Sequence, residues 1–212
     1  MKTPTLAPQQ DRSRQTLEAL LRATIAILDK EGLDACTLPR VAASAGVAAA
    51  TVYRRFADKD ALLRAAFLHV LKRSNQTNQA NFEKTLLRPS LEDTAERIVA
   101  ALLAQYREHP QLLRALSHFL EIQSGSEFAT LAQGLINTNL QLVASVLLHH
   151  RDRIRHANPQ RAAVFAVLQA SSSIETAMLT PDSLWSVALP LTDKQFTAEL
   201  TRAMLGYLRR KP

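Results

Sequence analysis

Residues 37–56 read Thr37-Leu-Pro-Arg-Val-Ala-Ala-Ser-Ala-Gly46-Val-Ala-Ala-Ala-Thr-Val-Tyr-Arg-Arg-Phe56. The stretch holds two short helical patterns, 38–45 and 48–56, on either side of Gly46, which allows a left-handed turn. Thr37 stands at the N-cap position of the first helix, and Pro39 suits its first turn because a missing N–H costs little there. Two short helices joined at a glycine are typical of a helix-turn-helix, and duplex DNA is the expected partner of such a unit.

Helical spacing continues outward from this motif on both sides. Before it, residues 12–31 are expected to be helical and to end at Gly32. After it, Asp58 caps a long helix that Pro89 stops, and proline or glycine separates the helices that follow. The sequence predicts these at about 58–87, 90 or 93–109, 110–123, 127–151, 159–179 and 193–210, with a loop at 180–192. The fold class is therefore all-α: a three-helix N-terminal helix-turn-helix head and a C-terminal helical bundle, about nine helices in all.

Composition limits the class of protein further. The chain has 212 residues, 47% of them apolar and only 5% aromatic, which favours a helical globular protein over a disordered or β-rich one. Residues 1–73 carry 12 Lys and Arg against 7 Asp and Glu, whereas residues 74–212 carry 14 against 12. Most of the net charge of +7 therefore lies in the part of the chain that holds the helix-turn-helix. A phosphate backbone would be attracted there. We expect no signal peptide, no membrane span and a cytoplasmic location.

The head needs a small core, and the residues left over face outward. Ten apolar residues have suitable spacing for that core: Leu21, Ile25, Leu28, Leu38, Val41, Ala42, Val47, Val52, Phe56 and Leu62. Short donors or a cation suited to phosphate oxygens occur at Thr37, Thr51, Tyr53 and Lys59. Candidates for contacts with bases or the groove are Arg40, Ala48, Ala49, Ala50, Arg54 and Arg55, of which Arg54 suits bidentate pairing with guanine. Several positions of the motif also have a plainer interpretation: a core aromatic at Tyr53 or Phe56, a cap at Thr37, or solvated charge at Arg54 and Arg55.

Residues 14–63 resemble the N-terminal DNA-binding domain of the TetR family of transcriptional repressors. The match runs through Gly32, Thr37, Val41-Ala42, Ala45-Gly46-Val47, Thr51, Tyr53, Phe56, Lys59 and Leu62. The resemblance implies a homodimer that binds a palindromic operator in double-stranded DNA and that an unknown small-molecule effector releases. The helical pattern itself divides the chain into a flexible tail at 1–11, a head at 12–60 and a body at 61–212. The resemblance implies that the head is a DNA-binding domain and that the body is a ligand-binding and dimerisation domain. Ala48 and Ala50 depart from the Ser and Gly that are frequent in the family, which puts the operator sequence in doubt.

The C-terminal body has polar residues inside apolar periodicities, as a pocket between bundle helices requires. The candidate pocket residues are Tyr106, His118, Phe119, Glu121, Asn137, Gln141, Gln169, Ser172 and Glu175. The alternative is that most of them face solvent or a dimer seam. Two helices with dense apolar stripes could pair with their symmetry mates as a four-helix bundle. The candidate interface residues are Phe165, Leu168, Phe196, Leu200, Met204 and Tyr207, and the alternative for these is an intrachain core.

Other chemistries find little support in the sequence. There is no Gly-rich phosphate loop, nucleophile elbow or HExxH motif, and no grouping with metal-ligand spacing, so we expect no enzyme, cofactor or metal site. The basic run 149–156 is interpreted as a solvated helix end. Cys36 is interpreted as a small buried hydrophobe rather than a redox sensor. Two alternatives to a ligand-responsive regulator stay open: a helix-turn-helix protein controlled by a protein partner, and a helical enzyme.

Overall fold

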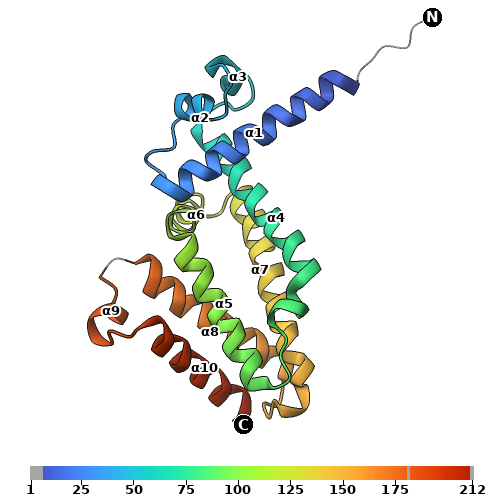
Figure 1. Cartoon of the computed structure of the whole chain (residues 1–212), viewed down its shortest axis with the longest axis vertical. Helices are drawn as coiled ribbons and strands as arrows, with labels where there is room; N and C mark the ends of the chain where they lie inside the picture. The colour runs from blue at the N-terminus through green and yellow to red at the C-terminus, as the bar shows by residue number, and fades with distance from the viewer. Residues whose placement is uncertain (1–6, 181, 211–212) are drawn as a thin grey trace, which may run out of the picture. The chain divides into compact units, whose positions relative to one another are not determined.

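The computed structural model describes residues 7–180 and 182–210, and within these ranges every regular element is helical (Figure 1). The α-helices are α1 (Ala7–Glu31), α2 (Leu38–Ser44), α3 (Ala49–Tyr53), α4 (Lys59–Leu86), α5 (Leu91–Glu108), α6 (Pro110–Ile122), α7 (Glu127–Leu147), α8 (Pro159–Leu179), α9 (Leu184–Ala188) and α10 (Asp193–Arg209), and the 3-10 helix η1 (Leu148–Arg153) follows α7. The predicted all-α fold is confirmed, and no strand occurs in the described ranges.

Helix α1 begins earlier than predicted. The helix is already present at Ala7, the first residue that the structure describes, whereas a flexible tail was expected at 1–11 and a helix only from residue 12. The prediction is therefore wrong for residues 7–11, and the remainder of that tail lies outside the described residues.

Side-chain caps fix where several other helices begin. The Asp58 carboxylate accepts the N–H of Ala61 at 2.6 Å at the start of α4, as predicted. At the start of α5, the Ser90 hydroxyl accepts the N–H of Asp93 at 3.0 Å, which selects residue 90 over 93 as the cap. Each bond satisfies a backbone donor that has no partner within its helix.

The segment predicted as a loop at 180–192 contains the short helix α9, which corrects that prediction. The N–H groups of Ser186 and Val187 both bond the carbonyl of Ser183, which closes its single turn. Trp185 packs edge-on against Phe196, with ring centroids 5.3 Å apart, so part of the helix is held on the core. Five residues are too few to show a helical period, and this is why sequence spacing missed α9.

The chain divides into two compact units. The first comprises the chain up to Lys72 together with Gln111–Ala132, and the second comprises Arg73–Pro110 and the chain from Gln133 onward. Helices α4 and α7 contribute residues to both units. The predicted domain boundary between residues 60 and 61 does not coincide with the boundary between these two units. It remains a prediction about which residues carry which function.

Each unit has its own apolar core. In the first, seven of the ten residues expected in the head core are buried, and Ile25, Leu38 and Val47 are half-buried at its edge. In the second, α5, α8 and α10 pack against one another around Ile98, Ile174 and Leu208, all at 0% exposure. The core of the second unit therefore includes the two helices for which a dimer seam was expected.

Two stretches, Glu127–Arg153 and Pro159–Leu179, are long and apolar enough to cross a membrane by length and composition alone. This differs from the expectation that no apolar run approaches a membrane span. Helix α8 buries seven residues, and six of them, including Ala162, Ala166 and Ile174, belong to the core of the second unit. A core helix of a soluble protein meets the same criterion, so the finding is weak support for a membrane segment.

Candidate nucleic-acid interface

The turn between α2 and α3 has the geometry that the sequence predicts. Gly46 has φ of +68°, and its N–H and that of Val47 return to the carbonyls of Ala43 and Ala42 at 3.2 and 3.0 Å. Val52 of α3 is completely buried, which fixes the rotation of α3 about its own axis. Ala49, Ala50 and Tyr53 of α3 are exposed, and Thr51 is half-buried.

The outward face of α3 combines methyl groups, a phenol and a cation. The three alanines at 48–50 are exposed, and so are Arg54 and Tyr53, the latter at 55%. The Arg54 guanidinium donates to the Thr51 hydroxyl at 3.3 Å, which keeps both side chains on this face. Methyl groups suit thymine, and arginine suits guanine in a major groove. The core-aromatic alternative fails for Tyr53 and holds for Phe56, which is buried.

Thr37 lies at the N-cap position of α2 with extended backbone, but its side chain makes no capping hydrogen bond. The residue is exposed. A cap role is thus absent from this structure, and the hydroxyl remains available to a phosphate oxygen.

Three of the predicted DNA-contacting cations are engaged inside the first unit. Arg40 forms an ion pair with Glu31 at 2.5 Å, which joins α2 to the end of α1. The Lys59 ammonium donates to the carbonyl of Leu33 at 2.9 Å.

The third cation is Arg55, whose guanidinium donates to both the carbonyl and the hydroxyl of Ser13, each at 2.8 Å. Sequence reasoning missed all three contacts because the partners are 9 to 42 residues apart in the chain, and local spacing does not predict contacts over such separations. Each contact sets the position of an element of the head.

Burial raises the pKa of the Cys36 thiol, although the nearby Lys59 and Arg40 act in the opposite direction. The side chain has no exposed surface. A protonated, inaccessible thiol is a poor nucleophile. This agrees with the interpretation of Cys36 as a buried hydrophobe.

The nine predicted pocket residues do not share one environment. His118 and Glu121 are exposed at 58% and 77% in the first unit, where their side chains lie 3.9 Å apart, so the solvent alternative holds for them. Phe119 is buried between Phe67 and Phe128, with ring centroids 5.5 and 5.3 Å away, and it fills the core of that unit. The other six belong to the second unit, where four are exposed: Asn137, Gln141, Gln169 and Ser172.

Tyr106 and Glu175 are the pair that the structure does bring together. Tyr106 on α5 packs against the core of the second unit, and burial raises the pKa of its phenol. The Glu175 carboxylate on α8 raises that pKa further. A half-buried phenol beside a carboxylate is the kind of polar grouping that fixes a ligand in an apolar site.

Five of the six predicted dimer residues fall into two groups, and the sixth, Tyr207, is half-buried against the core of the second unit. Phe196, Leu200 and Met204 are 6%, 8% and 2% exposed within the core of the second unit, so for these three the intrachain alternative is the correct one. Phe165 and Leu168 are each 48% exposed on α8. They line a surface hollow of about 460 Å³ together with Gln141 of α7, which places that predicted pocket residue on the same surface.

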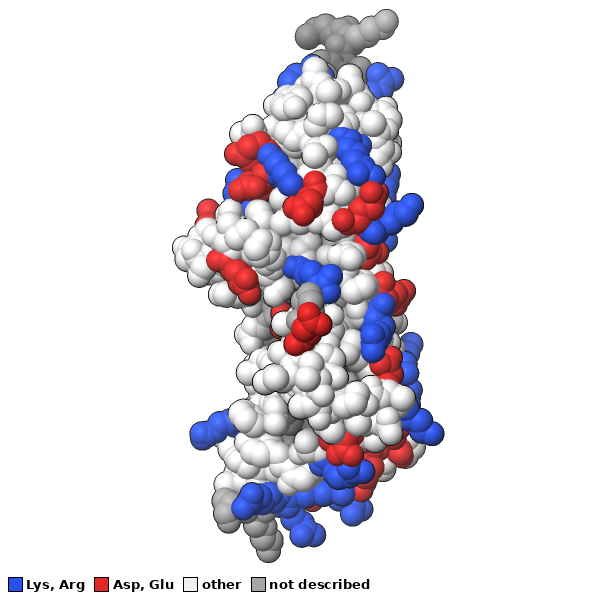
Figure 2. All heavy atoms as spheres, turned by 90° about the vertical axis from the view of Figure 1, so that its left-hand side faces the viewer, with Lys and Arg blue, Asp and Glu red and all other residues white. Residues whose placement is uncertain are grey.

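A second hollow of about 470 Å³ is basic, and Asp152, Arg153, Arg155 and Arg209 line it. Figure 2 shows one face of the molecule, with acidic and basic side chains intermixed over most of it and a group of Lys and Arg at its lower edge. Arg153 lies 3.3 Å from Asp152, and Arg209 pairs with Glu92, so much of this charge is locally balanced. Within the described ranges, no cluster of His, Cys, Asp and Glu could hold a metal ion.

Two family models match the chain. The model described as bacterial regulatory proteins, tetR family, matches residues 20–66 and thus the helix-turn-helix with the start of α4. The model described as tetracyclin repressor-like, C-terminal domain, matches residues 90–208, which is more than half of the chain.

Relatives and solved structures agree with these matches. An uncharacterized HTH-type transcriptional regulator of Mycobacterium tuberculosis is 26% identical over 205 residues, which cover 96% of this chain and 99% of that protein. A putative TetR-family regulator from Mesorhizobium loti has a TM-score of 0.66 at 17% identity, covering 93% of this chain and 96% of that one. FadR from Bacillus subtilis in complex with stearoyl-CoA has a TM-score of 0.61 at 15% identity, covering 90% and 97%. The two structural matches show a shared fold.

Proposed function

The chain belongs to the TetR family of bacterial regulatory proteins and is a helix-turn-helix transcriptional regulator, and we propose that it acts as a homodimeric repressor that a small molecule releases from a palindromic operator. The observation that carries the DNA-binding part is the outward face of α3, where Tyr53, Arg54 and three alanines are exposed. Thr37, at the start of α2, is exposed as well. We place the protein in the cytoplasm, where it meets the chromosome. Regulators of this family are not enzymes, so the enzymatic alternative is dropped.

In the proposed complex, two copies of α3 enter successive major grooves about 34–36 Å apart. Thr37, Thr51, Tyr53 and Lys59 bind phosphate oxygens and set the register, and Arg54 reads a base. Because each head contributes several phosphate contacts, the affinity falls steeply with salt concentration.

The second unit is the proposed sensor. Its dimer seam includes Phe165 and Leu168, and its effector site includes Tyr106 and Glu175. A ligand that favours a conformation with the wrong spacing of the two heads weakens operator binding, and the operator weakens ligand binding by the same factor. Control by a protein partner is the second candidate mechanism, and an apolar hollow open to solvent beside Phe165 is the observation that favours it.

The test is selection of genomic DNA fragments by the purified protein, compared with the Tyr53→Ala variant. We expect a palindromic sequence to be enriched by the native protein and not by the variant. Compounds related to the neighbouring genes are then tested for release of that fragment and for a reciprocal decrease in compound affinity when the fragment is bound. Absence of any enriched sequence with folded protein would overturn operator binding.

A further inference from the structure

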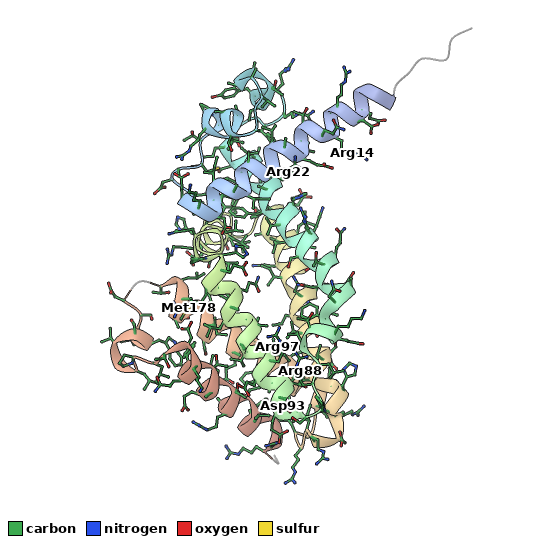
Figure 3. The ribbon with its side chains drawn as sticks, viewed as in Figure 1. Arg14, Arg22, Arg88, Asp93, Arg97 and Met178 are labelled. Atoms are coloured by element: carbon green, nitrogen blue, oxygen red, sulfur yellow. The ribbon has the colours of Figure 1, made fainter. Side chains whose placement is uncertain are left out.

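The part of α1 at residues 10–15 has no buried side chain. Residues 10–15, called the α1 overhang below, are all exposed, and the first buried side chains of the helix are Leu20 and Leu21. Figure 1 shows that the N-terminal half of α1 extends beyond α2 and α3, and Figure 3 marks Arg14 on this half and Arg22 further along the helix. A helix end without packing contacts frays readily, so a defined position requires some other anchor.

Arg55 supplies that anchor. It lies just beyond the end of α3, and its guanidinium donates to the carbonyl and to the hydroxyl of Ser13, each at 2.8 Å. A planar guanidinium that binds two oxygens of one residue fixes direction as well as distance. The α1 overhang is therefore held beside the end of α3 that carries Tyr53 and Arg54.

The anchor determines where the neighbouring cations lie. Successive residues of an α-helix are turned by about 100° around its axis, so Arg12 and Arg14 flank the side of the helix on which Ser13 meets Arg55. Within the described ranges, the Arg12 guanidinium has no hydrogen-bond or ion-pair partner. Arg14 lies 3.4 Å from Asp11, but both side chains are largely exposed, at 73% and 61%, and such a pair stabilises little.

We propose that the α1 overhang is a second DNA-binding element, in which Arg12 and Arg14 bind phosphates that flank the half-site contacted by α3. Arg55 is a positioning residue for this element and acts through Ser13. The inference rests on the proposed operator binding, and it names a surface outside the helix-turn-helix itself. Phosphates rather than bases are the expected target, because two long, exposed cations on one helix turn carry charge without a fixed geometry.

The test uses two duplexes that carry the sequence enriched in the genomic selection, one trimmed to the palindrome and one with extended flanks. The native protein binds the extended duplex more tightly and with a steeper salt dependence. The Arg12→Ala/Arg14→Ala variant binds both duplexes equally, and its slope of log affinity against log salt falls by about 0.9 for each phosphate that it no longer binds. Lys30→Ala, which removes an exposed cation at the other end of α1, is the matched control and leaves the difference between duplexes unchanged.

The positioning role is tested by Arg55→Ala in the native and in the Arg12→Ala/Arg14→Ala background. If Arg55 acts through the α1 overhang, it abolishes the advantage of the extended duplex in the first background and has no further effect in the second. Equal decreases in affinity in both backgrounds would show that Arg55 binds DNA directly and would overturn the positioning role. Circular dichroism of each variant verifies that the fold is intact.

The outcomes separate this inference from the proposed function. A native protein that prefers neither duplex over a scrambled one would overturn operator binding itself. A second outcome is that the native protein prefers the palindrome and that the Arg12→Ala/Arg14→Ala variant has the same affinity, salt slope and flank dependence as the native protein. This outcome would overturn the second DNA-binding element alone.

Discussion

The aromatic ring of Phe165 on α8 lies against that of Tyr207 on α10, with centroids 4.9 Å apart and planes tilted by 42°. Phe165 is nevertheless 48% exposed, as is Leu168 one turn later. A rigid aromatic pair beside a second exposed apolar side chain is costly to leave in water, and burial against a second copy removes that cost.

The double variant Phe165→Glu/Leu168→Glu is therefore expected to be monomeric. Burying one such half-exposed side chain contributes about 1 kcal/mol, and a two-fold symmetric dimer buries four of them, two from each copy. The dimer dissociation constant of the variant should therefore rise by roughly three orders of magnitude. Sedimentation velocity over a concentration series measures the change. Leu184→Glu, at an apolar residue of α9 that is 80% exposed, is the control and should leave the oligomeric state as it is. A native protein that is monomeric, or a double variant that still dimerises, would contradict the seam.

Two cations of the head should affect DNA binding in different ways. Arg54→Ala is expected to relax base preference at one position of each half-site, with discrimination reduced by about 1–3 kcal/mol. Lys59→Ala is expected to weaken binding to all sequences alike, because it removes a phosphate ligand together with the bond to the Leu33 carbonyl. Affinities for a panel of single-base variants of the selected palindrome distinguish the two effects. A relaxed preference from Lys59→Ala, with none from Arg54→Ala, would reverse the assignment.

Gly46→Ala should destabilise the head through backbone strain alone. A Cβ at this position meets no atom within 4 Å, but φ is +68°, a conformation that costs an L-residue about 1–2 kcal/mol. Gly46→Asn should cost less, since asparagine tolerates this region. Gly134→Ala in α7 is the matched control, because its Cβ also meets open space and its φ is ordinary; we expect it to stabilise by about 0.5–1 kcal/mol. Urea unfolding measures all three, and an equal effect at residues 46 and 134 would contradict the strain.

Tyr106 should make stability fall in alkaline solution. Burial and the Glu175 carboxylate raise its pKa in the folded protein, so the folded state holds the phenolic proton after the unfolded chain has lost it. The contribution is fully present below about pH 10, the ordinary tyrosine pKa, and is lost as the pH rises above that value. Tyr106→Phe should reduce the alkaline decrease in unfolding free energy. Glu175→Gln should lower the pKa of Tyr106 toward its ordinary value, as ultraviolet titration of tyrosinate would detect. An unchanged titration in Glu175→Gln would refute the pairing.

Local signals in the sequence were sufficient for most of the fold. Gly46 predicted the turn, Asp58 and Ser90 predicted helix starts, and apolar spacing identified most of the head core. These features act over a few residues, and that is the range within which spacing carries information. The proline and glutamine residues near the N-terminus were interpreted as a loose tail, although a proline is tolerated in the first turn of a helix.

The candidate sites depended on contacts between distant segments. Apolar spacing could not tell Met204, buried in the core, from Phe165, half-exposed on the neighbouring helix, because both lie on apolar stripes of core helices. The same limit applies to Arg55, which sequence reasoning assigned to DNA and the structure joins to Ser13. The position of a cation within a motif does not reveal a hydrogen-bond partner that comes from a distant part of the chain.

The run of alanines at 48–50 has a consequence for how this regulator could change its target. None of the three methyl groups is buried, and the turn is held by Gly46 and Val52 instead. In the proposed complex with DNA, replacing them with serine, asparagine, glutamine or arginine alters which bases are favoured while the scaffold keeps its free energy of folding. Duplicated copies of the gene could diverge toward separate regulons through these three codons, with the architecture that surrounds them unchanged.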